Sequence, residues 1–296
     1  MAFNINDLHN IPSFGVAGNF TGHLEQAGEA KDFLGTVTEE ENAPKALFPT
    51  FIPKTEGTPY NAPEFLSVYP FSSEKIIFPS EEVLHSGNLQ IEPECAFLCN
   101  VEWKDEKITS LTPVAFTASN DCSIRKEGAK KISEKKNWGE CSKGISENFI
   151  PLENYNSDCK LSDYRIASYL LRGDELFEYG ENSSVKSYSY IYEKLTRWLL
   201  EKLNNQKDSG PAENVYEYIK NFKPGQVLIS IGATRYTDFG EHNFLKAGDK
   251  SIVVLYPESV YSAGQIKNMI KDGTVHSKND ISFLEQTVCV KKLYFS

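Results

Sequence analysis

The sequence predicts an α+β fold in which β-strands predominate. From residue 75 onward, short runs rich in β-branched and aromatic residues recur between turn-forming segments, a pattern typical of strands. One long stretch, near residue 190, places apolar residues at helical spacing instead. We expect strands at residues 75–78, 88–101, 114–119, 165–171, 226–231, 251–256 and 288–295.

The first 74 residues differ from the rest because they are rich in Pro, Gly and Asn and show little periodicity. We therefore interpret residues 1–74 as an N-terminal segment and residues 75–296 as the main domain. Within the segment we expect a short helix at residues 23–33, and loop or short strand at residues 48–53. Its glycines favour a movable loop, so we interpret residues 15–33 as a lid.

The long helix is expected at residues 187–203. We interpret its apolar stripe as core packing rather than as an aromatic binding site. The polar run at residues 204–211 ends this helix, and a shorter helix is expected at residues 213–222. The stripe consists of Tyr188, Ile191, Tyr192, Leu195, Trp198, Leu199 and Leu203.

Composition narrows the function classes. A formal net charge of −10 at pH 7 argues against a nucleic-acid surface, and we interpret the lysine-rich run at residues 126–136 as a solvent-exposed helix face. The sequence suggests neither a signal peptide nor a membrane span, so we expect a cytoplasmic protein without a membrane partner. The six cysteines include no Cys-x-x-Cys pair, which favours reduced thiols over a zinc site.

Glu92 and Glu94 lie in an apolar run that is expected to be a strand. Side chains at positions i and i+2 of a strand point to the same face, so the two carboxylates are expected side by side. The opposite face would carry Cys95, Phe97 and Cys99 into the core. Adjacent buried carboxylates repel each other, and a hard cation such as Mg2+ would relieve that repulsion. The alternative is a solvated acidic strand face.

Asp121 follows the next apolar run, at a distance that allows a neighbouring strand to return to the glutamates. An Asp at such a position often only starts a turn or caps a helix. Together, two Glu and one Asp make an all-oxygen site suited to Mg2+ or Mn2+.

At this point the sequence resembles the fumarylacetoacetate hydrolase superfamily, which includes acylpyruvases and oxaloacetate decarboxylase-like enzymes. The resemblance rests on five motifs that occur in the family's order and span residues 18 to 234. They are Asn19-Phe20-Thr21-Gly22-His23, Glu92-Pro93-Glu94, Asn120-Asp121-Cys122-Ser123-Ile124-Arg125, Trp138 with Lys143, and Gly232-Ala233-Thr234.

The resemblance implies a rolled mixed β-sandwich with the site at one end and a homodimeric assembly. It implies Mg2+, with Mn2+ or Ca2+ as alternatives, on Glu92, Glu94 and Asp121. The implied substrate is a small α-keto or β-diketo acid such as an acylpyruvate. C–C bond hydrolysis is the leading reaction, with decarboxylation or keto–enol isomerisation as alternatives.

The resemblance also implies roles for individual side chains. His23, assisted by Glu25 or Glu29, would be the general base, although His23 could instead be a helix residue without chemistry. Lys143 would stabilise an oxyanion or hold the substrate carboxylate. The residues expected to contact substrate are Asn19, Arg125, Gly232 and Thr234.

The sequence also departs from the family pattern. Gly18 stands where the family often has a long or basic residue. Gln26 stands where the acid that partners the histidine is expected, and Gly-Ala-Thr replaces Gly-Thr-Pro at residues 232–234. These changes affect the catalytic parts and not the three carboxylates. A non-catalytic ligand-binding relative is therefore the alternative function.

Overall fold

The computed structural model describes residues 5–33, 38–79, 89–125 and 129–290. Strands dominate it, which confirms the predicted α+β, mostly β class. The strands are β1 (Ser13–Ala17), β2 (Ala46–Phe51), β3 (Phe71–Ser72), β4 (Lys75–Ile77), β5 (Leu89–Gln90), β6 (Pro93–Lys104), β7 (Lys107–Asn120), β8 (Ser123–Ile124), β9 (Lys143–Ile145), β10 (Ile150–Pro151), β11 (Tyr164–Arg172), β12 (Glu175–Ser184), β13 (Gln226–Ser230), β14 (Lys250–Pro257) and β15 (Ser282–Cys289).

The helices of the described residues are mostly short. The α-helices are α1 (His23–Gln26), α3 (Ser133–Lys136), α4 (Tyr192–Asn205), α5 (Val215–Ile219), α6 (Asp238–His242) and α7 (Ala263–Lys271). The 3-10 helices are η1 (Ile5–Asn10), η2 (Ala30–Phe33), η3 (Glu64–Ser67), η4 (Lys160–Asp163), η5 (Val185–Ser187) and η6 (Thr274–Ser277). None of the described helices has the length and apolar character needed to cross a membrane.

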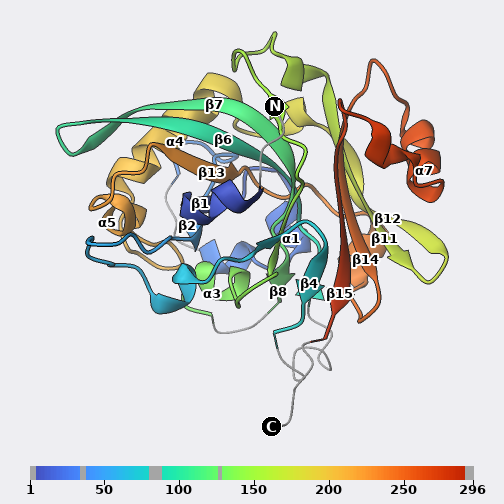
Figure 1. The fold of residues 1–296 in the computed structure, drawn as a ribbon, viewed down its shortest axis with the longest axis horizontal. Helices are drawn as coiled ribbons and strands as arrows, with labels where there is room; N and C mark the ends of the chain where they lie inside the picture. Colours follow the sequence, from blue (N-terminus) through green and yellow to red (C-terminus); the bar gives the residue numbers. More distant parts are fainter. Residues whose placement is uncertain (1–4, 34–37, 80–88, 126–128, 291–296) are drawn as a thin grey trace.

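Two mixed sheets form the body of the molecule (Figure 1). The larger sheet has the order β2-β1-β13-β6-β7-β9-β3, with β10 paired to β7, and the second has the order β12-β11-β14-β15-β4. β5 and β8 pair separately. The strand pairs β1–β13 and β3–β9 are parallel, whereas β6–β7 is antiparallel. This mixed pairing confirms the predicted rolled mixed β-sandwich.

The core lies between the two sheets, and alternation along the strands explains it. On β14, Val253 and Leu255 face the main core, while Ile252 and Val254 pack with Ile266 of α7 on the outer side (Figure 1). Residues 93–99 of β6 are buried on both faces of the sheet, and most of their side chains are accordingly apolar. The predicted core residues Cys95, Phe97 and Cys99 lie in the main cluster.

The hairpin of β6 and β7 places the acidic residues. Asp105 and Glu106 form its turn with positive φ angles of 46° and 64°, as two-residue hairpin turns require. The register pairs Pro93 with Asn120, so that Glu92 and Asp121 meet directly beyond the ladder. The predicted strand 88–101 is interrupted here, since β5 ends at Gln90 and β6 begins at Pro93; residue 88 lies outside the described residues.

The predicted helices differ from the observed ones. The expected helix at residues 23–33 is divided into α1 and η2, with Gly28 between them at a left-handed φ of +70°. The long helix begins only at Tyr192, because the Asn19 side chain binds both the N–H and the C=O of Tyr190 and holds the preceding chain outside the helix. Its stripe does pack in the core, as expected.

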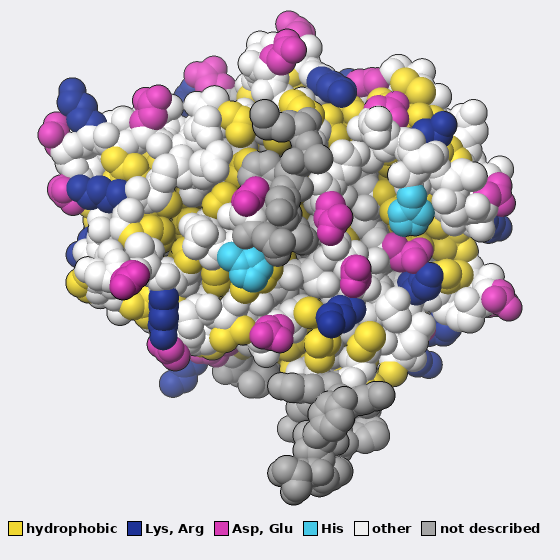
Figure 2. Space-filling model, in the orientation of Figure 1, with side chains coloured by type: hydrophobic (Ala, Val, Ile, Leu, Met, Phe, Trp, Pro, Cys, Tyr) yellow, Lys and Arg dark blue, Asp and Glu magenta, His cyan; other side chains and the backbone are white. Residues whose placement is uncertain are grey.

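Other strand predictions also need correction. The strand expected at residues 288–295 lies earlier, at β15, and residues 291–295 fall outside the described ones. β12 and α7 were not predicted. The boundary at residue 74 stays a prediction, although β1, β2 and β3 lie in the same sheet as β6 and β7. On the face shown in Figure 2, basic side chains are scattered among acidic ones.

Candidate active site

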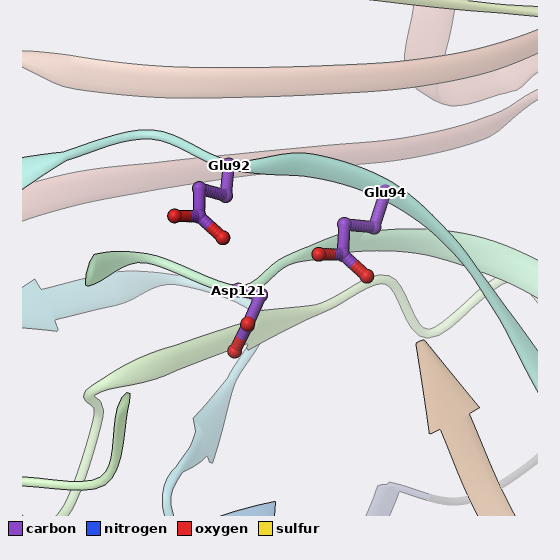
Figure 3. A group of neighbouring side chains, drawn as sticks. All are labelled: Glu92, Glu94 and Asp121. Atoms are coloured by element: carbon purple, nitrogen blue, oxygen red, sulfur yellow. The ribbon is translucent and has the colours of Figure 1, made fainter. Parts of the chain in front are cut away.

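Glu92, Glu94 and Asp121 converge at the end of the β6–β7 hairpin (Figure 3). One carboxylate oxygen from each lies within 4.8 Å of the other two, and all three residues are buried. The N–H of Asp121 donates to the C=O of Glu92 at 3.0 Å, which continues the hairpin pairing beyond β7. The structure therefore brings the three predicted metal ligands together in the predicted way.

Cationic side chains surround these carboxylates. Lys136 of α3 forms ion pairs with Glu92 and, at 2.8 Å, with Asp121. Lys143 of β9 lies 3.0 Å from the other Asp121 oxygen, and Arg125 lies 2.8 Å from Glu92. Oε1 of Glu92 and Oδ2 of Asp121 accept no hydrogen bond, but each lies 2.8 Å from an ion-pair partner, Arg125 and Lys136 respectively. Three buried carboxylates with one oxygen of each within 4.8 Å of the others form an all-oxygen donor set of the kind that a hard divalent cation takes.

The carboxylates differ in their electrostatic environment. Burial alone raises the pKa of Glu92, but Lys136 and Arg125 outweigh it and hold that pKa well below its usual range. Burial, together with Asp121 and Glu92, raises the pKa of Glu94 well above its usual value. Burial lowers the pKa of the Lys143 ammonium, and Asp121 opposes that shift only in part.

Gly232 and Thr234 follow β13, and Ala233 between them lines the small cavity beside the carboxylates. The N–H of Gly232 donates to Oε2 of Glu94 at 2.9 Å, so this glycine positions a predicted metal ligand. Thr234 is buried, and its hydroxyl has no hydrogen-bond partner. A buried hydroxyl without a partner is costly, but Thr234 is not among the residues that line the cavity beside the carboxylates.

His23 lies in α1, is buried, and packs its ring 5.2 Å from the ring of Tyr236. Its Nδ1 has no hydrogen-bond partner. Burial lowers the pKa of His23 although Glu92 opposes the shift, which favours the neutral imidazole that a general base needs. The two acids that were candidates to assist His23 lie in different places. Glu29 lines a small cavity together with His23 and the three carboxylates, whereas Glu25 is exposed and lies outside the site.

Two predicted substrate contacts are already engaged by the protein. Asn19 donates to the carbonyls of Tyr190 and Ile231, so its amide hydrogens hold the chain together rather than face a ligand. Arg125 binds Glu29, Glu92, Gln90 and the Tyr236 hydroxyl. The structure thus places Asn19 as a positioning residue and Arg125 in a buried network beside the carboxylates.

Gln26, which replaces the expected acid, has a structural partner. Its side-chain oxygen accepts from the N–H of Tyr236 at 2.8 Å, and its amide donates to the Tyr236 carbonyl at 3.1 Å. This two-point contact fastens α1 to the segment after β13. Gln26 therefore anchors the helix that carries His23.

A small cavity of about 20 Å³ lies at the centre of the site. This volume holds roughly one water molecule. Any larger ligand needs part of the wall to move, and the wall on one side consists of residues of α1, Glu29 before η2, and Ile132 and Lys136 at the two ends of α3. The cavity is lined by Val16, Ala17, Gly18, His23, Leu24, Glu29, Phe48, Glu92, Glu94, Asp121, Ile132, Lys136 and Ala233.

Sequence reasoning missed Lys136 and Tyr236. The run at residues 126–136 was expected to be a solvent-exposed helix face. This is wrong for Lys135 and Lys136, whose side chains are buried at 5% and 3% exposure. Residues 126–128 lie outside the described residues. Burial follows because each ammonium finds buried carboxylates as partners. Tyr236, two residues after Thr234, carried no motif signal.

Solved structures share this fold. The protein Cg1458 with inhibitor matches with a TM-score of 0.53, 12% identity, and coverage of 95% of this chain and 77% of the other. A 2-keto-3-deoxy-D-arabinonate dehydratase complexed with magnesium and 2,5-dioxopentanoate matches with a TM-score of 0.51, 13% identity, and coverage of 99% and 83%. These structures have the fumarylacetoacetate hydrolase-type fold, which confirms the predicted fold family.

Comparison with curated proteins found no match. A family described as "Family of unknown function (DUF5718)" matches residues 29–288, a span that includes the three carboxylates and excludes His23. The chain belongs to this family of unknown function, DUF5718.

Proposed function

We propose that this protein is a Mg2+-dependent enzyme that acts on a small α-keto or β-diketo acid. The observation that carries the proposal is the buried cluster of Glu92, Glu94 and Asp121, in which one carboxylate oxygen of each residue lies within 4.8 Å of the other two. Buried carboxylates in contact are unfavourable unless cations compensate them; Arg125, Lys136 and Lys143 pair with Glu92 and Asp121, and Mg2+ would supply positive charge shared with Glu94.

The dehydratase structure supports the choice of metal and substrate class. It shares the fold at 13% identity and is complexed with magnesium and 2,5-dioxopentanoate, a 2-oxo acid. Fold similarity alone does not carry function; the carboxylates of this chain are what support a metal here. Mn2+ or Ca2+ would suit the same oxygen ligands.

Mg2+, His23 and Lys143 would have different roles in the reaction. Bound Mg2+ would supply a Lewis acid that polarises substrate oxygens. Neutral His23 would take a proton from the attacking water at a ring nitrogen. Lys143 would hold Asp121 in place and donate to a substrate oxygen that gains negative charge.

C–C bond hydrolysis is the proposed reaction. With an acylpyruvate, water adds to the acyl carbonyl, the C–C bond breaks, and the released carbon takes up a proton, giving a carboxylate and pyruvate. Decarboxylation, dehydration or keto–enol isomerisation would use the same groups. We further propose a cytoplasmic homodimer.

A turnover assay tests this function. Acylpyruvates, oxaloacetate and 2-keto-3-deoxy sugar acids should be supplied with Mg2+ and, separately, with a chelator. The proposal expects turnover of at least one of these acids, lost on chelation. Turnover unaffected by chelation would contradict the metal dependence.

A non-catalytic ligand-binding protein is the second candidate. Two observations favour it: Gln26 is a structural anchor in place of an acid, and the cavity is about 20 Å³. In that case, oxo-acids would raise the melting temperature in Mg2+ without being consumed.

A further inference from the structure

Lys136 places its ammonium between Glu92 and Asp121, two of the three candidate metal ligands. Its ammonium is within ion-pair distance of one oxygen from each of these residues, and the side chain is buried. It also lines the small cavity that the three carboxylates line. A cation already on the chain therefore bridges two of the three candidate metal ligands.

Cationic side chains already compensate most of the carboxylates of the site. Glu29, Glu92 and Asp121 form ion pairs with Arg125, Lys135, Lys136 and Lys143, whereas Glu94, whose pKa burial raises well above its usual value, takes part in none of these pairs. A divalent cation added to this buried set would repel the ammonium that contacts the same oxygens, and the repulsion is strong where water is excluded. The two oxygens, one from Glu92 and one from Asp121, can bind either the Lys136 ammonium or a divalent cation, but not both at once.

We propose that Lys136 is a tethered competitor for the metal: its ammonium holds Glu92 and Asp121 together, and a divalent cation binds only when this side chain leaves. The inference rests on the metal centre of the proposed function. It adds that the cation must exchange with a residue of the chain, so that α3 responds to metal binding.

The position of α3 links this exchange to the opening of the cavity. Lys135, the neighbour of Lys136, forms ion pairs with Glu29 at 2.9 Å and with Asp32 of η2 at 3.0 Å. Movement of Lys136 therefore disturbs the contact between α3 and the segment that carries Glu29. These are parts of the wall that must move before a substrate larger than water can enter.

Calorimetric titration with Mg2+ tests the competition. Lys136→Met should bind Mg2+ at least about tenfold more tightly than the wild type, because a repelling unit charge has been removed from the ligand oxygens. Without metal, this variant should melt at a lower temperature than the wild type, since two buried carboxylates lose a partner, and Mg2+ should restore its melting temperature more than it raises that of the wild type.

Lys135→Met is the matched control. It removes a buried ammonium from the same helix, but Lys135 contacts Glu29 and Asp32 and not the metal ligands. Its Mg2+ affinity should change by less than about threefold, because the lost charge is more distant from the bound cation. An equal gain in both variants would overturn the proposal, since it would show a general charge effect.

Lysine modification provides a second measurement that uses the wild type and is independent of the folding of any variant. An amine-reactive reagent followed by mass spectrometry should label Lys136 faster with saturating Mg2+ than with a chelator. Lys136 that stays protected while Mg2+ is bound would overturn the proposal.

The outcomes separate this inference from the proposed function. Tighter binding in Lys136→Met supports the competition even if no oxo-acid is turned over. Turnover that needs Mg2+, together with unchanged or weaker affinity in folded Lys136→Met, would keep the function and reject the competition. Mg2+ binding by the variant alone would support the competition and contradict Mg2+ dependence of the wild type.

Discussion

The backbone N–H of Gly232 donates a hydrogen bond to Oε2 of Glu94 at 2.9 Å. This contact joins the chain that leaves β13 to the first residues of β6. Gly232 has a φ of +109°, a conformation that residues with a Cβ rarely adopt. A Cβ here would lie 3.1 Å from Cβ of Asn19 and 3.2 Å from the carbonyl oxygen of Val16. Glycine at position 232 thus permits the backbone conformation whose N–H orients Glu94, a candidate metal ligand.

Gly232→Ala should therefore weaken both the fold and the metal site. We expect a loss of about 1–3 kcal/mol in the free energy of unfolding, the usual cost of such strain, and weaker Mg2+ binding because Glu94 loses its orienting donor. Urea denaturation and calorimetry measure the two effects.

Gly248→Ala is the control for strain alone. Gly248 has a φ of +88°, but a Cβ there meets no atom within 4 Å. This variant should lose stability and keep its Mg2+ affinity. If both variants bind Mg2+ like the wild type, the contact between Gly232 and Glu94 does not matter for the metal.

Glu94→Ala should remove the response to Mg2+. A ligand present at 100 times its dissociation constant stabilises a protein by about 2.7 kcal/mol, so millimolar Mg2+ should raise the melting temperature of the wild type and leave that of Glu94→Ala unchanged. Glu102→Ala, on the exposed part of the same strand, should respond like the wild type. A preserved response in Glu94→Ala would exclude this carboxylate as a ligand.

His23→Asn should reduce turnover of any oxo-acid substrate by roughly 100-fold or more, the usual scale for a lost general base, while Mg2+ affinity stays nearly intact. His242→Asn, at an exposed helix position, is the control. If turnover survives in His23→Asn but disappears in Lys143→Ala, another group handles the proton.

Glu213 should make stability depend on pH. It is buried, one of its oxygens has no hydrogen-bond partner, and burial raises its pKa from 4.5 to about 7. Between these two values the folded protein binds more protons than the unfolded chain, so this group lowers stability as the pH rises. The shift corresponds to at most about 3 kcal/mol.

Glu213→Gln removes this titration. The free energy of unfolding of the variant minus that of the wild type should therefore be larger at pH 8 than at pH 5. Urea denaturation at both pH values measures this difference. Glu153→Gln, at an exposed position, should show the same difference from the wild type at both pH values. A difference for Glu213→Gln that does not change with pH would show that Glu213 ionises normally.

The carboxylate cluster could be predicted from the sequence because its geometry is local. Two Glu at i and i+2 and an Asp at the end of the returning strand are brought together by one hairpin register. Lys136 could not be predicted, since a lysine-rich run normally indicates solvent exposure and only distant partners bury it.

The choice between Glu25 and Glu29 also lay beyond sequence reasoning. Both acids follow His23 within a few residues, but the left-handed turn at Gly28 ends α1 and directs Glu29 toward Arg125. The start of α4 depends in the same way on Asn19, which is distant in sequence. A left-handed glycine interrupted the helix expected at residues 23–33, and long-range hydrogen bonds from Asn19 set the start of the long helix.

Anomalous diffraction from crystals grown with Mn2+ tests the metal centre most directly. We predict one anomalous peak bonded to Glu92, Glu94 and Asp121 at about 2.0–2.2 Å, the distance typical of hard cations with oxygen ligands, with the Lys136 ammonium displaced from these carboxylates. Crystals at saturating Mn2+ in which no peak lies among the three carboxylates, and Lys136 still bridges Glu92 and Asp121, would contradict the metal-dependent account.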